Sequence, residues 1–414
     1  MNKTNIIKDQ SRYKVPYENL KIGILGSGLM GHGIALSAAL NGNNVIMLDK
    51  SQKKAERGLQ SIKYILNKGV KNGFYNIQES KRVLSKILPT SNYNNLKDCD
   101  LIIEAVFEDF GLKRRVIVEA EKIMKPQAIF ASNTSTLPIT ELAKNSKRPD
   151  NFLGLHFFSP VHRMKLVEII KGGSTSQQTL SLAYNYVKSI GKTPIIVNDG
   201  AGFYTTRVFE RYTCEGMALL YEGTDPKRIE NLSKKAGYPI GPLAILDEIN
   251  ISLAAKIRAT LRKNSKSADA SWDQVMKIMI KDLNRTGRSS GGGFYEYSNG
   301  KKKFLWPKLK KIFPISKNKL SDNDIIDRLY FSQVIETICC IEENIIKSID
   351  DANIGSILGW GFPKETGGIL EFANKYGLQN FLNQSKYLQK KYGRRFSPPD
   401  LLIDMVKNKT SFKD

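Results

Sequence analysis

The sequence predicts an α/β domain with a doubly wound parallel sheet, followed by two tandem all-α helical domains. Strand-like and helix-like patterns alternate through roughly the first 200 residues, which is typical of a parallel sheet covered by helices. Helical periodicity dominates from about residue 202 onward, with Gly and Pro at the joints. A chain of 414 residues is also too long for one simple core, so we expect two or three domains.

Short apolar runs between turn residues predict buried strands at 21–26, 44–49, 100–106 and 128–132. Helix-like patterns predict helices at 29–41, 51–70 and 78–87. Because the stretch 51–87 is too long for one crossover helix, we expect it to project as a helical pair. The link "NDGAGF" marks the end of the sheet domain. The expected divisions are a leader at 1–20, the sheet domain at 21–200, a first helical domain at 201–300, a connector at 301–320 and a second helical domain at 321–414.

The helical part of the chain repeats itself. Three charged residues recur 121 positions later: Arg207, Glu215 and Glu222 as Arg328, Glu336 and Glu343. The segment "GYPIGPLAIL" recurs loosely as "GFPKETGGIL" in the same order. Chance could produce the charges alone, but the shared Gly-aromatic-Pro favours a duplication, so the second helical domain is expected to be a repeat of the first.

Basic residues outnumber acidic ones, with 64 Lys and Arg against 40 Asp and Glu and a formal net charge of +24. A nucleic-acid binder is one interpretation. A general excess of lysine over every helix is the other, and we favour it because the densest run, "KKKFLWPKLKK" at 301–311, lies in a Pro-containing connector. A basic surface would also attract a polyanionic small molecule.

The cysteines and the apolar runs of the sequence indicate the cellular compartment in which we expect the protein. The four cysteines form no C-x-x-C pair and no regular framework, which favours a reducing compartment and no metal site: Cys99, Cys214, Cys339 and Cys340. No apolar run has the length of a bilayer span, and the N-terminus has no apolar signal region. We therefore expect a cytoplasmic protein, with the mitochondrial matrix as the less favoured location.

The segment "GSGLMG" places Gly26, Gly28 and Gly31 in a G-x-G-x-x-G pattern. It follows an apolar strand, opens a helix and precedes a second strand that ends in Asp49, as in a dinucleotide-binding Rossmann-like unit. A carboxylate there would accept hydrogen bonds from a ribose and repel a 2′-phosphate, which favours NAD over NADP, although Lys50 weakens this preference. The alternative is a glycine-rich turn that binds nothing. The predicted cofactor-binding residues here are Gly26, Gly28, Leu29, Met30, Gly31 and Asp49.

His156 stands in an apolar strand-like run, and Glu168 lies in a second such run 12 residues later. Two neighbouring strands joined by "SPVHRM" would bring imidazole and carboxylate together. A histidine can take the hydroxyl proton of an alcohol as hydride leaves its carbon, and a carboxylate on the other ring nitrogen fixes the tautomer and stabilises the imidazolium. The alternative is a core histidine satisfied by a backbone carbonyl. We expect His162 in a surface loop and His32 in local packing.

Taken together, these residues resemble the 3-hydroxyacyl-CoA dehydrogenase family, in the form found in the alpha subunit of fatty-acid oxidation multienzymes such as the trifunctional protein. The resemblance covers nearly the whole chain, from Lys21 to about Phe412. It rests on "GSGLMGHGIA", "EAVFED", "ASNTSTLPIT", "GLHFFSPVHRMKLVEII", "DGAGFYTTR" and "GGGFYEY". The second helical repeat, with "GFPKETGG" and "YGRRFSPPDLL", is similar to the multienzyme subunits.

The resemblance implies roles position by position. His156 matches the family's catalytic base, Glu168 its partner, and Ser135 the serine that hydrogen-bonds the substrate oxygen. Two positions match residues near the nicotinamide end of the cofactor, and a third matches a lysine that contacts the cofactor: Asn133, Glu108 and Lys113, respectively.

The chain departs from the family pattern at two positions. Many members have Asn where this chain has Ser159 and Thr206, and both variants resemble the trifunctional alpha subunits. The Thr206 hydroxyl could still donate one hydrogen bond, so we keep it as a candidate catalytic residue. The multienzymes also carry an enoyl-CoA hydratase domain before the glycine loop, where this chain has only about 20 residues. We therefore expect the chain to lack hydratase activity.

The expected function is NAD-dependent oxidation of (3S)-3-hydroxyacyl-CoA to 3-oxoacyl-CoA in fatty-acid β-oxidation. One alternative is a dehydrogenase of a small free hydroxy acid, which would need an anion clamp that the sequence does not identify. The other is a non-catalytic scaffold that binds a thiolase or nucleic acid. The expected partners are the acyl-CoA substrate and either a second copy of the chain or a thiolase subunit, without nucleic acid and without a membrane span.

Overall fold

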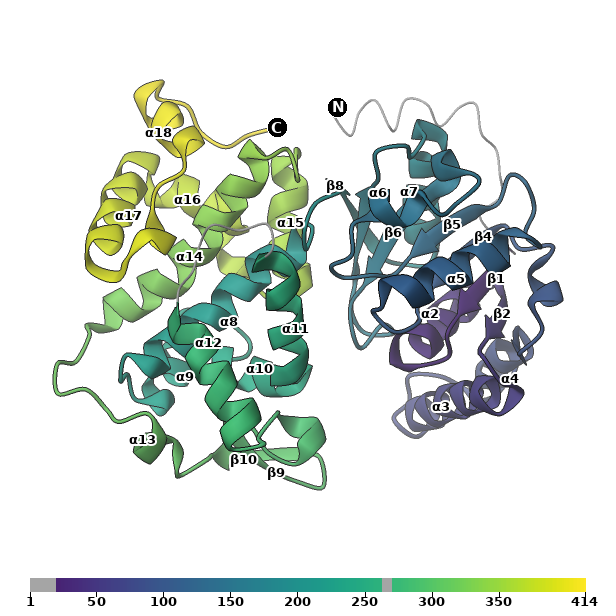
Figure 1. The fold of residues 1–414 in the computed structure, drawn as a ribbon, viewed down its shortest axis with the longest axis horizontal. Helices are drawn as coiled ribbons and strands as arrows, with labels where there is room; N and C mark the ends of the chain where they lie inside the picture. The colour runs from purple at the N-terminus through teal and green to yellow at the C-terminus, as the bar shows by residue number, and fades with distance from the viewer. Residues whose placement is uncertain (1–19, 263–269) are drawn as a thin grey trace. The chain divides into compact units, whose positions relative to one another are not determined.

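The structure, a computed structural model, describes residues 20–262 and 270–414 (Figure 1). The chain forms two compact units, one that ends at Phe203 and one that begins at Tyr204. The leader predicted at 1–20 lies outside the described residues, apart from Leu20. Both helical repeats belong to the second unit, and the finer division of that unit stays a prediction.

The first unit is built on an eight-stranded sheet in the order β3-β2-β1-β4-β5-β6-β7-β8. Its strands are β1 (Lys21–Leu25), β2 (Asn44–Leu48), β3 (Ile87–Thr90), β4 (Leu101–Glu104), β5 (Ile129–Ser132), β6 (Phe152–Phe157), β7 (Leu166–Lys171) and β8 (Thr193–Asn198). Every neighbouring pair is parallel except β6 and β7, which are antiparallel. The predicted doubly wound sheet is confirmed, and its buried strands explain the nearly continuous apolar runs in the sequence.

Helices connect and cover these strands (Figure 1). They are α2 (Leu29–Leu40), α3 (Gln52–Lys71), α4 (Ile77–Ser85), α5 (Phe110–Glu121), α6 (Ile139–Ala143) and α7 (Gln177–Ser189). The long insertion forms α3 and α4, which contact each other, so the predicted helical pair is confirmed. One face of α3 is buried at Ala55, Gly58, Ile62, Leu66 and Gly69, the spacing of an amphipathic helix.

Two strands of this sheet escaped sequence analysis. Strand β3 contains Pro89 and strand β8 contains Pro194. Both lie at the edges of the sheet. Proline cannot donate a ladder hydrogen bond, so edge strands tolerate it, while in a sequence it weakens the strand pattern.

The second unit, in the part that the structure describes, has the strands of one antiparallel hairpin, β9 (Tyr295–Ser298) and β10 (Lys301–Leu305). Its helices are α8 (Thr205–Tyr221), α9 (Pro226–Lys235), α10 (Pro242–Ile249), α11 (Ile251–Arg262), α12 (Ala270–Lys277), α13 (Leu309–Ile312), α14 (Asp322–Glu342), α15 (Ile349–Trp360), α16 (Ile369–Tyr376), α17 (Leu378–Tyr392) and α18 (Asp400–Lys407). The basic run at 301–311 therefore begins as strand β10 and continues into α13. Among the described residues, no helix combines the length and apolarity that a bilayer crossing requires.

The two helical repeats meet along α8 and α14, which pack against each other. The recurring charges pair crosswise between the repeats: Arg207 with Glu336 and Glu343, and Arg328 with Glu215 and Glu222. Each arginine thus contacts the acidic residues of the other copy, as expected for two equivalent elements packed face to face. This reciprocity supports the duplication inferred from sequence.

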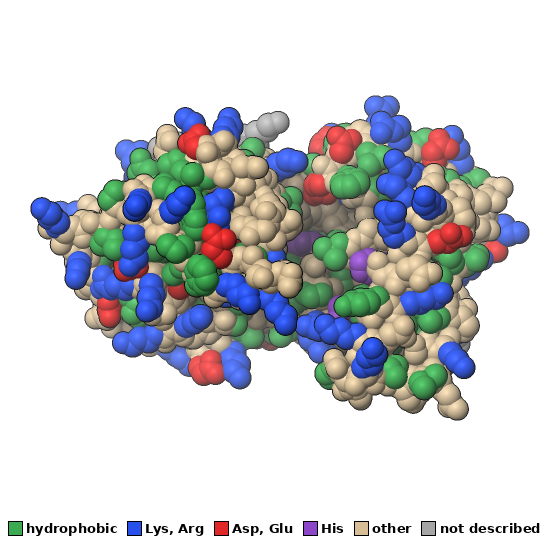
Figure 2. All heavy atoms as spheres, turned by 90° about the horizontal axis from the view of Figure 1, so that it is seen from below, with side chains coloured by type: hydrophobic (Ala, Val, Ile, Leu, Met, Phe, Trp, Pro, Cys, Tyr) green, Lys and Arg blue, Asp and Glu red, His purple; other side chains and the backbone are tan. Residues whose placement is uncertain are grey.

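Basic side chains are spread over the surface. Figure 2 shows Lys and Arg on both units, with Asp and Glu side chains among them. On this face, the excess positive charge is a general property of the surface.

Candidate active site

The antiparallel pair β6 and β7 brings the predicted imidazole and carboxylate together. His156 lies opposite Glu168 in the strand register, so both side chains leave the same face of the sheet. His156 Nδ1 and Glu168 Oε2 are 2.9 Å apart, and the predicted contact is confirmed. Glu168 is fully buried and His156 is 8% exposed. A carboxylate with so little access to water interacts strongly with a positive charge on the ring.

This contact sets the chemistry of the histidine. Since Glu168 accepts from Nδ1, the proton of the neutral ring sits on Nδ1, and Nε2 is the nitrogen that can exchange a proton. The ring lies against aromatic neighbours, with centroid distances of 4.4 Å to Phe158 and 6.5 Å to Phe203. Burial among these rings limits the approach of water. The pair can therefore accept a proton at Nε2 and hold the resulting charge.

The turn between β6 and β7 is anchored by a lysine. Lys192 Nζ donates to the carbonyl oxygens of Val161 and Met164, at 2.7 and 2.8 Å. Burial, and to a lesser extent nearby Lys165, lowers the pKa of Lys192 to about 8. His162 lies half-buried in this turn. Lys192 thus fixes the loop that follows the catalytic candidate.

The glycine loop has the geometry that the motif predicts. Gly26 has φ +98°, and its N–H donates to Leu48 O at 2.8 Å. A Cβ on Gly31 would lie 1.8 Å from the carbonyl oxygen of Gly26, so only glycine permits this close packing. A Cβ on Gly28 would have no heavy atom within 4 Å. The loop is tight on its protein side and open at Gly28.

These features fit a dinucleotide. Gly28 is the N-cap of α2, no described side chain caps that helix, and its first turn has no acidic residue. Free backbone N–H groups and the helix dipole therefore favour an anion in the open space at Gly28. Leu29 is exposed and Met30 is half-buried at the same helix start.

Asp49 also braces the loop. Its Oδ2 accepts from the N–H and the hydroxyl of Ser27, at 2.9 and 2.7 Å, and its Oδ1 accepts from Lys50 N at 2.8 Å. A carboxylate oxygen can accept more than one hydrogen bond, so contact with a ribose is compatible with this geometry. Sequence analysis did not identify Ser27, whose only signal was its place inside the glycine motif.

Asn133 ties the end of β5 to the strand that carries the histidine. Its Oδ1 accepts from Phe157 N at 2.8 Å, and its own N–H donates to Glu104 O at 2.8 Å. The predicted cofactor-binding asparagine therefore lies beside the residue that follows His156.

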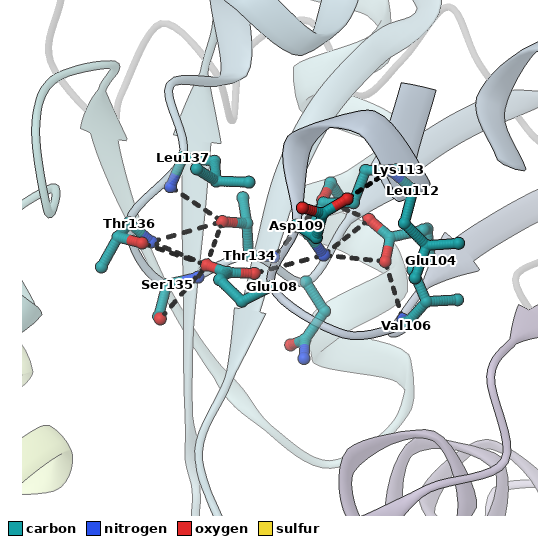
Figure 3. A network of polar contacts seen from close by, with 12 residues as sticks. Glu104, Val106, Glu108, Asp109, Leu112, Lys113, Thr134, Ser135, Thr136 and Leu137 are labelled. Atoms are coloured by element: carbon teal, nitrogen blue, oxygen red, sulfur yellow. Dashed lines mark hydrogen bonds and ion pairs between the residues drawn. The ribbon is translucent and has the colours of Figure 1, made fainter. Parts of the chain in front are cut away.

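Ser135 and Glu108 lie together in the turn after β5. Glu108 Oε1 accepts from Thr134 Oγ1 at 2.6 Å and from Ser135 N at 3.0 Å (Figure 3). Burial opposes ionisation of Glu108, but Lys113 and the hydrogen bonds from this turn outweigh it, and the pKa of the carboxyl is lowered. The structure brings these two predicted residues together, with Glu108 holding the backbone of Ser135.

Lys113 is 1% exposed, and its ammonium group lies between Glu104 and Glu108. Most of its hydrogen-bonding capacity is therefore engaged inside the protein. Glu104 was not predicted as a site residue. Its signal was a charged residue at the end of the otherwise apolar run "DLIIEAV", since a glutamate in a buried strand requires a partner.

Thr206 lies in the first turn of α8, in the second unit. The other predicted catalytic and cofactor-binding residues belong to the first unit. Within that unit, α2 links two parts of the site, because a Cβ on Gly33 would lie 2.9 Å from Val161 Cβ in the turn after β6.

Comparisons with known proteins agree with this architecture. Residues 21–200 match the family model described as "3-hydroxyacyl-CoA dehydrogenase, NAD binding domain", and residues 202–297 match "3-hydroxyacyl-CoA dehydrogenase, C-terminal domain". The chain is 36% identical to the fatty acid oxidation complex subunit alpha of Shewanella frigidimarina over 416 residues, which covers 96% of this chain and 56% of that protein. It is also 36% identical to the subunit of the same name from Vibrio vulnificus, over 99% of this chain and 58% of that protein. The chain thus spans little more than half the length of these relatives.

Solved structures show the same fold. A 3-hydroxybutyryl-CoA dehydrogenase from Escherichia coli superposes with a TM-score of 0.82 at 23% identity, covering 94% of this chain and 99% of that one. An (S)-3-hydroxybutyryl-CoA dehydrogenase from Ralstonia eutropha is 34% identical, with a TM-score of 0.64, and covers 68% of this chain and 100% of its own.

Proposed function

The chain belongs to the 3-hydroxyacyl-CoA dehydrogenase family, and from this membership we propose that it oxidises (3S)-3-hydroxyacyl-CoA to 3-oxoacyl-CoA with NAD, as a step of fatty-acid oxidation. The observation that carries the proposal is the buried pair of His156 and Glu168, 2.9 Å apart on the antiparallel strands β6 and β7. Such a pair is what removal of a hydroxyl proton requires.

The proposed chemistry divides between the cofactor and the protein. NAD, held at the glycine loop around Gly28, would supply the acceptor for the hydride of the carbinol carbon. His156 accepts the hydroxyl proton at Nε2 as the carbonyl forms. Glu168 orients the ring through Nδ1 and stabilises the imidazolium, because a buried carboxylate interacts strongly with a positive charge that develops beside it. General-base catalysis of this kind contributes about 10²–10⁴-fold.

Two further residues are proposed to bind the substrate oxygen. Ser135 would donate a hydrogen bond from its hydroxyl, with its backbone held by Glu108. Thr206, in the second unit, is proposed as a hydrogen-bond donor only from the family resemblance, in the place where many members have Asn. The fixed turn at Ser135 supports this proposal, because positioning contributes to rate only when the donor is held still.

The proposed cofactor preference follows from the end of β2. The carboxylate of Asp49 would accept the ribose hydroxyls and repel a 2′-phosphate, so we propose NAD over NADP. The open space at Gly28 would receive the pyrophosphate. Association with a thiolase subunit or with a second copy of the chain is also proposed, since the relatives are named as subunits of a fatty acid oxidation complex.

Steady-state kinetics test this proposal. We expect NADH formation from (S)-3-hydroxyacyl-CoA esters, compared over a series of acyl lengths and with NAD and NADP in parallel. The matched control is free 3-hydroxybutyrate, which lacks the CoA group. We expect turnover of the CoA ester and little turnover of the free acid.

The other outcomes identify the rivals. Faster turnover of the free acid than of its CoA ester would favour a dehydrogenase of small hydroxy acids. Absence of NADH formation with every ester, in a protein that is folded and binds NADH, would favour a scaffold and contradict the proposed reaction.

A further inference from the structure

Glu104 is a fully buried carboxylate to which the proposed reaction assigns no role. It ends strand β4 and is 0% exposed. Its Oε1 accepts from Val106 N at 2.7 Å and from Lys113 Nζ at 2.8 Å, and its Oε2 accepts from Ser132 Oγ at 2.7 Å (Figure 3). Removal of a carboxylate from water costs a large desolvation free energy unless it is paired and hydrogen-bonded. These partners meet that requirement.

Lys113 connects Glu104 to a second carboxylate. Its Nζ lies 2.8 Å from Glu104 Oε1 and 3.3 Å from Glu108 Oε2. Two carboxylates held close together repel each other, and the lysine between them cancels that repulsion. The position of Glu108 therefore depends on Lys113, and the position of Lys113 depends on Glu104.

Glu108 passes this constraint to the turn that carries Ser135. Its Oε2 faces Lys113, while its Oε1 accepts from Thr134 Oγ1, Ser135 N and Thr136 Oγ1, at 2.6, 3.0 and 3.1 Å. One carboxylate thus binds three consecutive residues of the turn. The side chains in Figure 3 form a continuous path from Glu104 through Lys113 and Glu108 to Ser135.

A second arm runs from Glu104 to the same turn. Ser132 donates its hydroxyl to Glu104, and the Ser132 oxygen accepts from Thr134 N at 3.4 Å. We name Glu104, Lys113, Glu108 and Ser132 the Glu104 network. The arm through Ser132 reaches the backbone N–H of Thr134, and the arm through Lys113 and Glu108 reaches the Thr134 hydroxyl and the two residues after it. Both arms begin at the Glu104 carboxylate.

We propose that Glu104 is a positioning residue for the reaction, acting through the Glu104 network to fix the turn that presents Ser135 to the substrate oxygen. This inference rests on the proposed function, because it takes Ser135 as the residue that binds that oxygen. The reason is geometric: a displacement of about 1 Å in a group that positions substrate can lower the rate on the order of 10²-fold.

Glu104→Gln is the direct test, because it keeps the shape of the side chain and removes its charge. Lys113 then has Glu108 as its remaining carboxylate, and that pair is free to move away from the turn. We expect kcat to fall on the order of 10–10²-fold, measured with a 3-hydroxyacyl-CoA ester that the parent protein oxidises. In a Ser135→Ala background, the same change is expected to lower kcat by less than about twofold, since effects that act through one residue do not add.

The matched control is Glu121→Gln. Glu121 is also a buried glutamate of the same unit, 5% exposed, and it accepts from Ser146 Oγ and from Lys147 N in the loop after α6. It too holds a loop, so its loss tests the effect of a buried carboxylate as such. We expect Glu121→Gln to lower the unfolding midpoint and to leave kcat within about twofold of the parent protein.

If Glu104→Gln does not fold, the double variant Glu104→Gln with Lys113→Met removes both buried charges and is expected to fold. Its kcat should stay low, because Glu108 has lost its bridge. Parent-like kcat in a folded Glu104→Gln or double variant would overturn the inference. The inference would also be overturned if the reductions in kcat caused by Glu104→Gln and by Ser135→Ala multiplied fully in the variant that carries both changes. If the parent protein itself forms no NADH from any ester, the proposed function has failed, and the positioning role fails with it.

Discussion

At the scale of single residues, two buried carboxylates of this protein are each paired with a specific partner. Glu168 and Glu104 are both fully buried. Glu168 faces an imidazole 2.9 Å away, whereas Glu104 faces an ammonium group at 2.8 Å. The ring of His156 has a second nitrogen, Nε2, that can take up a proton, whereas the ammonium group of Lys113 is engaged by Glu104 and Glu108. We propose that the same type of buried carboxylate serves proton transfer in one place and fixed geometry in the other.

His156→Gln and Glu168→Gln are expected to lower kcat by about 10²–10⁴-fold, because one removes the proposed base and the other the charge proposed to stabilise its protonated form. NAD affinity should change little, since both residues lie on β6 and β7 and not in the glycine loop. The measurements are steady-state kinetics and a fluorescence titration with NADH. His162→Gln, a histidine in the adjoining turn, is the control and should retain parent-like turnover. Near-normal kcat in either variant would remove the assigned role.

At the scale of elements, the strand–turn–helix unit β1–α2 separates two uses of glycine. Gly31 is required by packing, because a Cβ there would meet the carbonyl oxygen of Gly26. Gly28 has open space around its Cβ position, with φ −67°, a value that any residue can adopt. Packing of the fold therefore does not require glycine at position 28.

Gly31→Ala should destabilise the first unit by roughly 1–3 kcal/mol or more, since the added methyl overlaps backbone that cannot rotate away. Gly28→Ala should cost less than about 1 kcal/mol, the usual effect of alanine at an N-cap. It should nevertheless weaken NADH binding by at least about tenfold, or ~1.4 kcal/mol, because the methyl enters the space that we propose for the pyrophosphate. Urea unfolding and NADH titration of the two variants separate these effects. Equal NADH affinity in Gly28→Ala and the parent protein would argue against a pyrophosphate at this position.

At the scale of the whole molecule, the second unit is organised by two buried ion-pair clusters between its repeats. Glu336 forms ion pairs with Arg207 and Arg211. Glu215 forms ion pairs with Arg328 and with Arg395, which lies in the segment after α17. Burial opposes ionisation of Glu215, but the two arginines outweigh burial and lower its pKa. Because the folded-state pKa is lowered, this stabilisation is present above the usual carboxyl pKa and is lost as the pH falls through the folded value.

Arg328→Met should destabilise the second unit by roughly 3–5 kcal/mol, because Glu215 would keep a buried charge with one partner fewer. Arg207→Met, the equivalent change in the other repeat, should cost less, because Arg207 is 17% exposed where Arg328 is 0% exposed. Urea unfolding at neutral pH compares the two variants directly. A smaller loss of unfolding free energy in Arg328→Met than in Arg207→Met would show that burial does not set the strength of these ion pairs.

Much of the fold and of the site could be predicted from sequence because the relevant signals are local. Alternation of short apolar runs with helical periods predicts the parallel sheet, and the spacing of Gly26, Gly28 and Gly31 predicts the loop. The His156–Glu168 contact was also accessible, since two strands joined by a short turn pair in few registers. The edge strands β3 and β8 were missed because a proline interrupts each short pattern.

The sequence by itself determined the interior strands of the sheet and the helices around them, and where a dinucleotide loop and a histidine–glutamate pair lie. Only the tertiary structure determined which charged residues, distant in the sequence, are buried in contact with one another. Glu104, Lys113 and Ser132 come from three separate elements, and the crosswise arginine pairs join residues more than 100 positions apart. The physical reason is that strand and helix patterns follow from neighbours along the chain, whereas the partner of a buried charge is fixed by packing.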